Sequence, residues 1–263
     1  MSKRKDKSKS YEDKWFKNIE QNWASILYGN ALLLPFTLPI IAWLVICQCY
    51  SALLGAASQA VGGGMVLMCL GLLPCAEIYA VGLAGAVWLN KCILYDGNMG
   101  ILKRFAEGIR TNALKYMLFV FLMWLSSSLA MITPALYSLI GNAILFGVGS
   151  VVAIGQTLLI IPPMCLAMIQ CVFFEDKLRL HLSNAYKLYF IRPFKTIGAT
   201  LLSMLPFTLC MFLPFIWQLA FWVVYVVVGV SFGLLFRLIR GKMYFDWVLA
   251  RSDKAQQNNI ENN

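Results

Sequence analysis

Between Tyr116 and Phe174 the chain reads YMLFVFLMWLSSSLAMITPALYSLIGNAILFGVGSVVAIGQTLLIIPPMCLAMIQCVFF, without any Asp, Glu, Lys or Arg. Two further stretches are similar: residues 21–90 hold only Glu77, and residues 196–236 hold no charged side chain. A water-soluble domain has too little interior to bury three such stretches. The sequence therefore predicts an all-α, polytopic membrane protein.

The length of these stretches sets the number of spans. A helix rises about 1.5 Å per residue, so about 20 apolar residues cross a hydrocarbon core of about 30 Å. On this scale the stretches divide into six transmembrane helices, at residues 24–46, 65–89, 116–138, 148–172, 196–213 and 216–236. We expect segment 47–64 to turn the chain between the first two spans. Gly82-x-x-Gly85, Gly149 and Gly155 are expected to allow close helix packing.

The basic residues orient the spans. All 22 Lys and Arg side chains fall in four segments: residues 1–23, 91–115, 177–195 and 237–263. With six spans these segments share one side of the membrane, and the three turns on the other side carry no charge. Positive charge collects on the cytoplasmic side, so both termini are expected there. The predicted domains are a basic tail with a short interfacial helix (1–23), a six-helix domain (24–236) and a C-terminal tail (237–263).

Two cytoplasmic loops have the pattern of amphipathic surface helices that run into the next span. They are Gly100–Lys115 and Lys177–Lys195. The first ends in TNALK (111–115) and the second contains SNAYK (183–187). Either the unit of span, surface helix and returning span is duplicated, or the matches arose by chance in apolar sequence.

A proline-containing span, a charged turn and a surface helix follow one another at Pro74, Asp96-Gly97, Phe105 and Asn112–Lys115, with a similar later segment at Leu182–Leu188. This order resembles the YesL-like family of bacterial multi-span membrane proteins of unknown function. The likeness covers roughly residues 23–247 and rests on pattern and spacing. It implies a protein of the bacterial cytoplasmic (inner) membrane, linked with carbohydrate uptake systems.

Glu77 is the only ionisable side chain near the middle of a span, where a charge costs about 2.5–3.5 kcal/mol. One hypothesis makes it a proton or substrate site with Gln156 and Gln170. The other makes it a protonated carboxyl group that hydrogen-bonds Tyr79, Gln156 or Gln170 and so holds helices together. The resembled family has a small or apolar residue near this position, so the resemblance gives Glu77 no role.

Prolines and asparagines mark other candidate positions. Pro74, Pro162 and Pro163 are predicted structural breaks, with the last two interrupting the fourth span, either as a kink or as an unwound binding segment. Asn112 and Asn184 lie where each surface helix enters the membrane. Their amides could pair with each other, or be satisfied by headgroups and water.

The sequence carries no motif of a nucleotide-driven motor or of a zinc protease. It lacks GxxxxGKS/T and HExxH, its eight cysteines have no CxxC spacing, and its one histidine is His181. We therefore expect no catalytic residues, no cofactor and no metal site. The basic loops suit anionic inner-leaflet lipids rather than nucleic acid.

Three functions follow as hypotheses. The preferred one is a non-enzymatic accessory or regulatory component of a carbohydrate transport system, with ABC-type permease or ATPase subunits as partners. The alternative is an autonomous secondary transporter with a mid-membrane site near Glu77. The third is a lipid- or envelope-organising protein that acts through its basic inner face.

Overall fold

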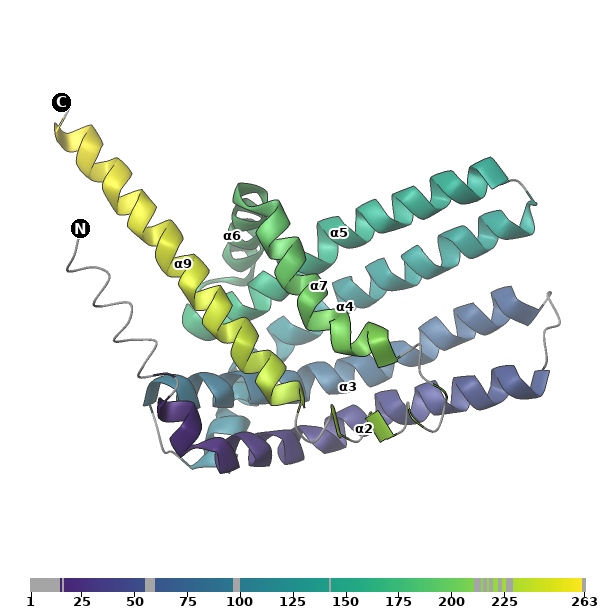
Figure 1. Ribbon diagram of the computed structural model, residues 1–263, viewed down its shortest axis with the longest axis horizontal. Helices are drawn as coiled ribbons and strands as arrows, with labels where there is room; N and C mark the ends of the chain where they lie inside the picture. The colour runs from purple at the N-terminus through teal and green to yellow at the C-terminus, as the bar shows by residue number, and fades with distance from the viewer. Residues whose placement is uncertain are drawn as a thin grey trace.

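The computed structural model describes residues 15, 17–54, 60–96, 100–141, 143–210, 214, 217, 220–221, 224–225 and 229–261. Every element in this part of the chain is a helix (Figure 1). The elements are α2 (Trp23–Leu54), α3 (Ala60–Asp96), α4 (Ile101–Leu139), α5 (Ala143–Phe173), α6 (Leu178–Ile191), α7 (Pro193–Cys210) and α9 (Val230–Glu261). The all-α prediction is confirmed for these residues.

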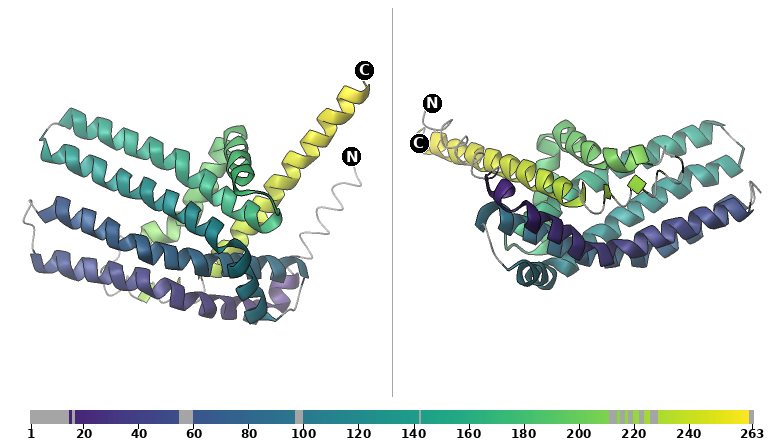
Figure 2. Two further views of the ribbon diagram at one scale, coloured as in Figure 1. Left: turned by 180° about the vertical axis from the view of Figure 1, so that it is seen from behind. Right: turned by 60° about the horizontal axis from the view of Figure 1, so that its bottom comes forward.

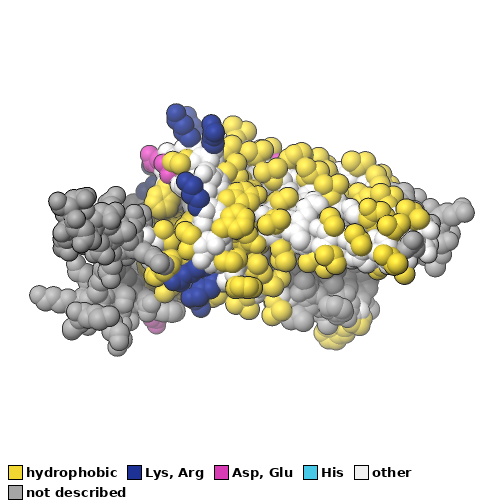
Figure 3. All heavy atoms as spheres, turned by 90° about the horizontal axis from the view of Figure 1, so that it is seen from above, with side chains coloured by type: hydrophobic (Ala, Val, Ile, Leu, Met, Phe, Trp, Pro, Cys, Tyr) yellow, Lys and Arg dark blue, Asp and Glu magenta, His cyan; other side chains and the backbone are white. Residues whose placement is uncertain are grey.

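The four longest apolar helices form a row. α3 packs against α2 and α4, and α4 packs against α3 and α5, so the row follows chain order. α7 and α9 cross over one face of this row (Figures 1 and 2). In Figure 3 apolar side chains cover much of the visible face, and Lys and Arg gather toward one end. Four helices are long and apolar enough to span a membrane, at Trp23–Cys49, Gly64–Tyr95, Ile101–Pro134 and Ala143–Phe173. The chain therefore has the features of a membrane protein.

The first two helices are longer than predicted. α2 continues to Leu54 and α3 already begins at Ala60, so the chain passes from one helix to the next within segment 47–64, as predicted, but the described residues of that segment are helical. Hydropathy gives the minimum length that crosses the bilayer, and it does not mark where a helix ends. Where water is scarce, a helix that continues keeps its backbone hydrogen bonds, which favours the longer form.

The prolines do not break their helices. α3 continues through Pro74, and α5 continues through Pro162 and Pro163, so the fourth span is not unwound there. A proline removes one backbone N–H and leaves the carbonyl four residues earlier without that donor. Apolar surroundings stabilise the remaining hydrogen bonds, because no water competes for them.

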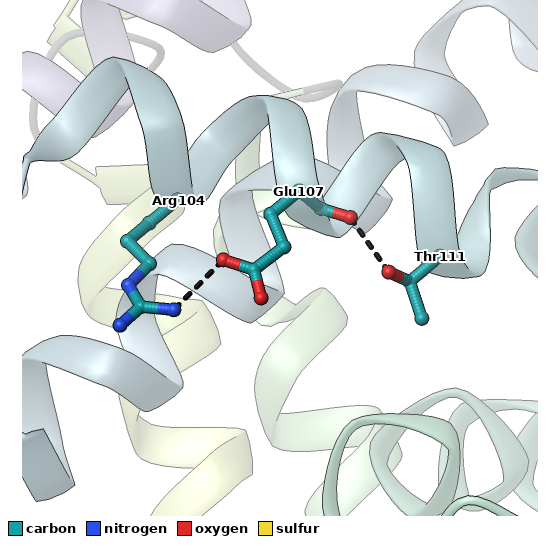
Figure 4. Close-up of polar contacts among 3 residues, drawn as sticks. All are labelled: Arg104, Glu107 and Thr111. Carbon is teal, nitrogen blue, oxygen red and sulfur yellow. Dashed lines mark hydrogen bonds and ion pairs between the residues drawn. The ribbon is translucent and has the colours of Figure 1, made fainter.

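The first predicted surface helix merges with the span that follows it, because α4 runs from Ile101 to Leu139 without a break. Its polar face carries an ion pair between Arg104 Nη1 and Glu107 Oε2 at 2.8 Å (Figure 4). The Thr111 hydroxyl donates to the Glu107 carbonyl at 2.8 Å. This pair is partly exposed to solvent and contributes at most about 1 kcal/mol.

The second predicted surface helix is separated from its span. α6 ends at Ile191, the next residue Arg192 has a backbone (φ −143°, ψ 66°) that is not helical, and α7 begins at Pro193. Proline is favoured at a first helical position, because its missing N–H would have no partner there. α6 packs its apolar face on α5, burying Ala185, Leu188 and Tyr189 among others.

The last two predicted spans are only partly described. α7 covers the fifth, but it is not among the four helices long and apolar enough to cross a membrane. The sixth, at 216–236, lies largely outside the described residues. Six spans with both termini in the cytoplasm therefore stay a prediction.

The short helix predicted before the first span packs on the protein itself. Residues 15 and 17–21 are helical. Trp15 is only 7% exposed, and its ring meets that of Tyr95 edge-on at 6.1 Å. Trp23, in contrast, is exposed. Trp15 therefore belongs to the buried core of the protein.

Candidate functional site

A cavity of about 570 Å³ lies between α5, α7 and α9. Four cations line it: Arg192, Lys195, Arg237 and Arg240. Hydroxyl groups also line it, from Thr196, Thr200, Ser203 and Tyr244. None of the described lining residues is Asp or Glu. The remaining lining is mostly apolar, so the cavity combines a hydrophobic wall with unbalanced positive charge.

Arg237 reaches from α9 into the space between four helices. Its Nη2 donates a hydrogen bond to Ser203 Oγ on α7 at 2.7 Å. It also interacts electrostatically with Tyr79 on α3 and Cys165 on α5. Among the described residues no carboxylate forms an ion pair with it. A guanidinium group has five N–H donors, and within the described part of the chain Ser203 takes up one of those of Arg237.

Aromatic rings hold the other guanidinium groups. Arg192 lies over the ring of Trp247, 3.3 Å from its centroid, and Arg240 lies 5.4 Å from the ring centroid of Phe236. Such cation–π contacts fix a guanidinium plane without neutralising its charge. The Tyr244 hydroxyl donates to the Leu188 carbonyl at 2.6 Å and so ties α9 to α6. The positive charges are therefore pre-positioned.

The backbone explains why these groups meet. The break at Arg192 places that side chain and Lys195 at the start of α7. Gly241 lets α9 approach α5 closely, since a Cβ there would lie 2.8 Å from Ile169 Cγ2. α9 then brings Arg237 and Arg240 to the same space.

A second polar cluster lies where α4, the end of α5 and the start of α6 meet. His181 on α6 is 1% exposed, and its Nε2 has no hydrogen-bond partner among the described residues. Lys115 Nζ donates to the Asp176 carbonyl at 3.3 Å. Burial lowers the pKa of His181, the charge of Lys115 lowers it further, and Asp176 opposes both effects. The imidazole is therefore neutral at pH 7.

This pKa shift predicts a pH-dependent stability. The pKa of His181 is near 6.5 in the unfolded chain and lower in the folded chain. Between these two values the unfolded chain binds a proton that the folded chain does not bind. The free energy of unfolding should therefore be greatest above about pH 6.5 and should fall as the pH decreases toward the folded pKa. Thermal unfolding in detergent from about pH 8 to about pH 5 checks this. His181→Gln should flatten the profile, and a variant with an unchanged slope would contradict the prediction.

The sequence-predicted residues around Glu77 do not form one site. Glu77 is half-buried, and its Oε2 has no hydrogen-bond partner among the described residues. Tyr79 lies about 200° further round α3, so its side chain leaves the helix on a different face from that of Glu77. Gln156 and Gln170 are about 21 Å apart along α5, because each residue rises about 1.5 Å. None of Glu77, Gln156 and Gln170 lines the basic cavity.

The two asparagines have different surroundings. Asn112 is 1% exposed, and neither Oδ1 nor Nδ2 has a partner among the described residues. It therefore does not pair with Asn184, and headgroups cannot reach it. Asn184 is half-buried on α6.

Sequence reasoning missed the basic cavity. In the prediction from sequence, the four lining cations were used only to orient the spans. They are Arg192, Lys195, Arg237 and Arg240. Their position at the ends of apolar stretches was visible, but which ends meet depends on helix packing. Of the predicted breaks, Pro162 alone lines the cavity. Among the described residues, no group of three or more His, Cys, Asp or Glu could hold a metal ion.

Comparisons with protein-family models, curated proteins and solved structures found no match to the chain. The resemblance to the YesL-like family therefore stays a prediction from sequence pattern.

Proposed function

We propose that the protein is a non-enzymatic accessory or regulatory subunit of a membrane transport system. Carbohydrate uptake is the system that the resemblance to the YesL-like family suggests. The observation that supports this proposal is the course of α9, which extends past the end of the helix row where Lys and Arg gather (Figures 1 and 3). Its 32 residues make a rod of about 48 Å, long enough to contact a partner outside the apolar belt.

The chemistry of the basic cavity is consistent with a binding role. Guanidinium, ammonium and hydroxyl groups line it. Such groups bind and orient an anion, whereas acid–base or nucleophilic catalysis needs an additional activated base or nucleophile. ABC-type permease or ATPase subunits remain the proposed partners, since an accessory subunit relies on another protein for energy.

Crosslinking in native membranes tests the proposal. The full chain carries a photo-crosslinking residue at position 252, in the distal part of α9, and a matched control carries it at Val151, which is 70% exposed on α5. After gentle solubilisation we expect the position-252 chain to form an adduct with a permease or ATPase subunit, and the control to react with lipid.

Recovery of the chain alone from both samples would contradict the accessory function. That result would favour the autonomous secondary transporter, and uptake by Glu77→Gln would be measured next.

A further inference from the structure

We propose that the basic cavity binds the phosphate headgroup of an anionic phospholipid, with an acyl chain in the apolar cavity beside it. This inference does not depend on the accessory function. It assigns a ligand to a space between α5, α7 and α9 that holds positive charge without a carboxylate partner among the described residues.

Charge is the first argument. Four cations converge on one cavity, and like charges at short range repel each other, the more so beside apolar walls. The ion pairs among the described residues, Arg104–Glu107 and Lys242–Asp246, do not involve any of the four. An anion in the cavity relieves this repulsion. Basic pockets between transmembrane helices are a recurrent site for acidic lipid headgroups.

The geometry favours phosphate. A guanidinium group offers two parallel N–H donors to one phosphate, a fit that ammonium cannot match. Arg237 Nη2 donates a hydrogen bond to Ser203 Oγ at 2.7 Å, and the guanidinium group of Arg192 lies over the ring of Trp247. The Thr196 hydroxyl donates to the Arg192 carbonyl, and the Thr200 hydroxyl donates to the Thr196 carbonyl. The cations are therefore the groups that contact the headgroup.

An adjoining apolar cavity distinguishes a lipid from a soluble phosphate. It measures about 470 Å³ and shares Leu202, Ser203 and Phe236 with the basic cavity. Its further lining includes Phe221, Val224 and Gly233, and a Cβ at Gly233 would meet no atom within 4 Å. A phosphate site that continues into an apolar space matches an amphiphile, because a lipid acyl chain keeps apolar surroundings there, whereas a soluble phosphate leaves that space unfilled.

The outer side of α7 continues this apolar surface. Leu201, Leu202 and Leu205 are exposed there. A lipid can therefore enter sideways from the bilayer, without its chain crossing water.

The test measures lipid binding to the purified full chain in neutral detergent. Native mass spectrometry and thermal unfolding are recorded with phosphatidylglycerol, phosphatidylcholine and inorganic phosphate. We expect phosphatidylglycerol to bind and to raise the unfolding temperature, and phosphatidylcholine to bind at least about tenfold more weakly. Equal binding of the two lipids would overturn the proposal. Inorganic phosphate that binds as tightly as phosphatidylglycerol would overturn the lipid assignment and leave a soluble phosphate.

Variants separate the headgroup from the chain. Arg237→Gln with Arg240→Gln should weaken phosphatidylglycerol binding about tenfold or more, while the exposed control Lys103→Gln should not. Gly233→Leu fills the apolar cavity and should weaken binding of long-chain phosphatidylglycerol more than that of a short-chain form. Gly155→Leu, also into open space but outside both cavities, is its control.

If the double variant fails to fold, Arg240→Gln alone and Gly233→Leu still decide the question. Unchanged phosphatidylglycerol binding by both of these variants would overturn the proposal.

Discussion

Replacing Gly108 with leucine is expected to lower the unfolding temperature in detergent by about 10 °C. A Cβ at this position would lie 2.5 Å from Trp88 Cβ, 2.9 Å from the Ala84 carbonyl oxygen and 3.0 Å from Gly85 Cα. Two of these atoms are backbone, so no rotamer change relieves the overlap. α3 and α4 must separate, and overpacking of this kind costs about 3 kcal/mol, or about 10 °C for a chain of this size.

Gly155→Leu is the matched control. Both glycines lie inside helices, so the gain in helix propensity is the same for the two changes. A Cβ at Gly155 would meet nothing within 4 Å, and this variant should unfold within a few degrees of the parent. Thermal unfolding monitored by tryptophan fluorescence compares the two. If they shift equally, the close approach of α3 and α4 is not the cause.

The sequence predicted close packing at the glycines of α3 but did not indicate Gly108 on α4. Gly82-x-x-Gly85 indicated close packing, and the structure confirms it, with Gly82 against Phe36 and Gly85 against Phe105. Gly149 likewise lies against Tyr137, but Gly155 faces open space. Small residues show where a helix can be approached. They do not show whether it is approached, which depends on the facing helix.

Charge spacing predicted the apolar helices because lipid and protein interiors both exclude unpaired charge. The same signal overestimated how much sequence a turn needs, since α2 and α3 extend well beyond the length of a bilayer core. It also could not find the basic cavity, whose Arg192, Ser203 and Arg237 come from the α6–α7 break, α7 and α9. Residues far apart in the chain meet there through packing that hydropathy does not describe.

Asn112→Leu is expected to raise the unfolding temperature by about 5 °C. The amide is 1% exposed, and neither of its polar atoms has a hydrogen-bond partner among the described residues. A buried, unsatisfied polar group costs about 1–3 kcal/mol, and leucine branches at the same carbon without carrying that cost. Tyr116 and Phe119, one and two turns further along α4, are fully buried, so the site is apolar. The gain should be about 2 kcal/mol.

Asn184→Leu is the informative control because TNALK and SNAYK align these two asparagines. α4 continues without a break into its span, and Asn112 is buried on it, whereas α6 ends at Ile191 and Asn184 on it is half-buried. The same substitution should therefore change stability by at most about 0.5 kcal/mol at Asn184. If Asn112→Leu instead destabilises the protein, the Asn112 amide has a hydrogen-bonding partner outside the described residues. The asparagines of TNALK and SNAYK would then differ in their hydrogen bonding as well as in their burial.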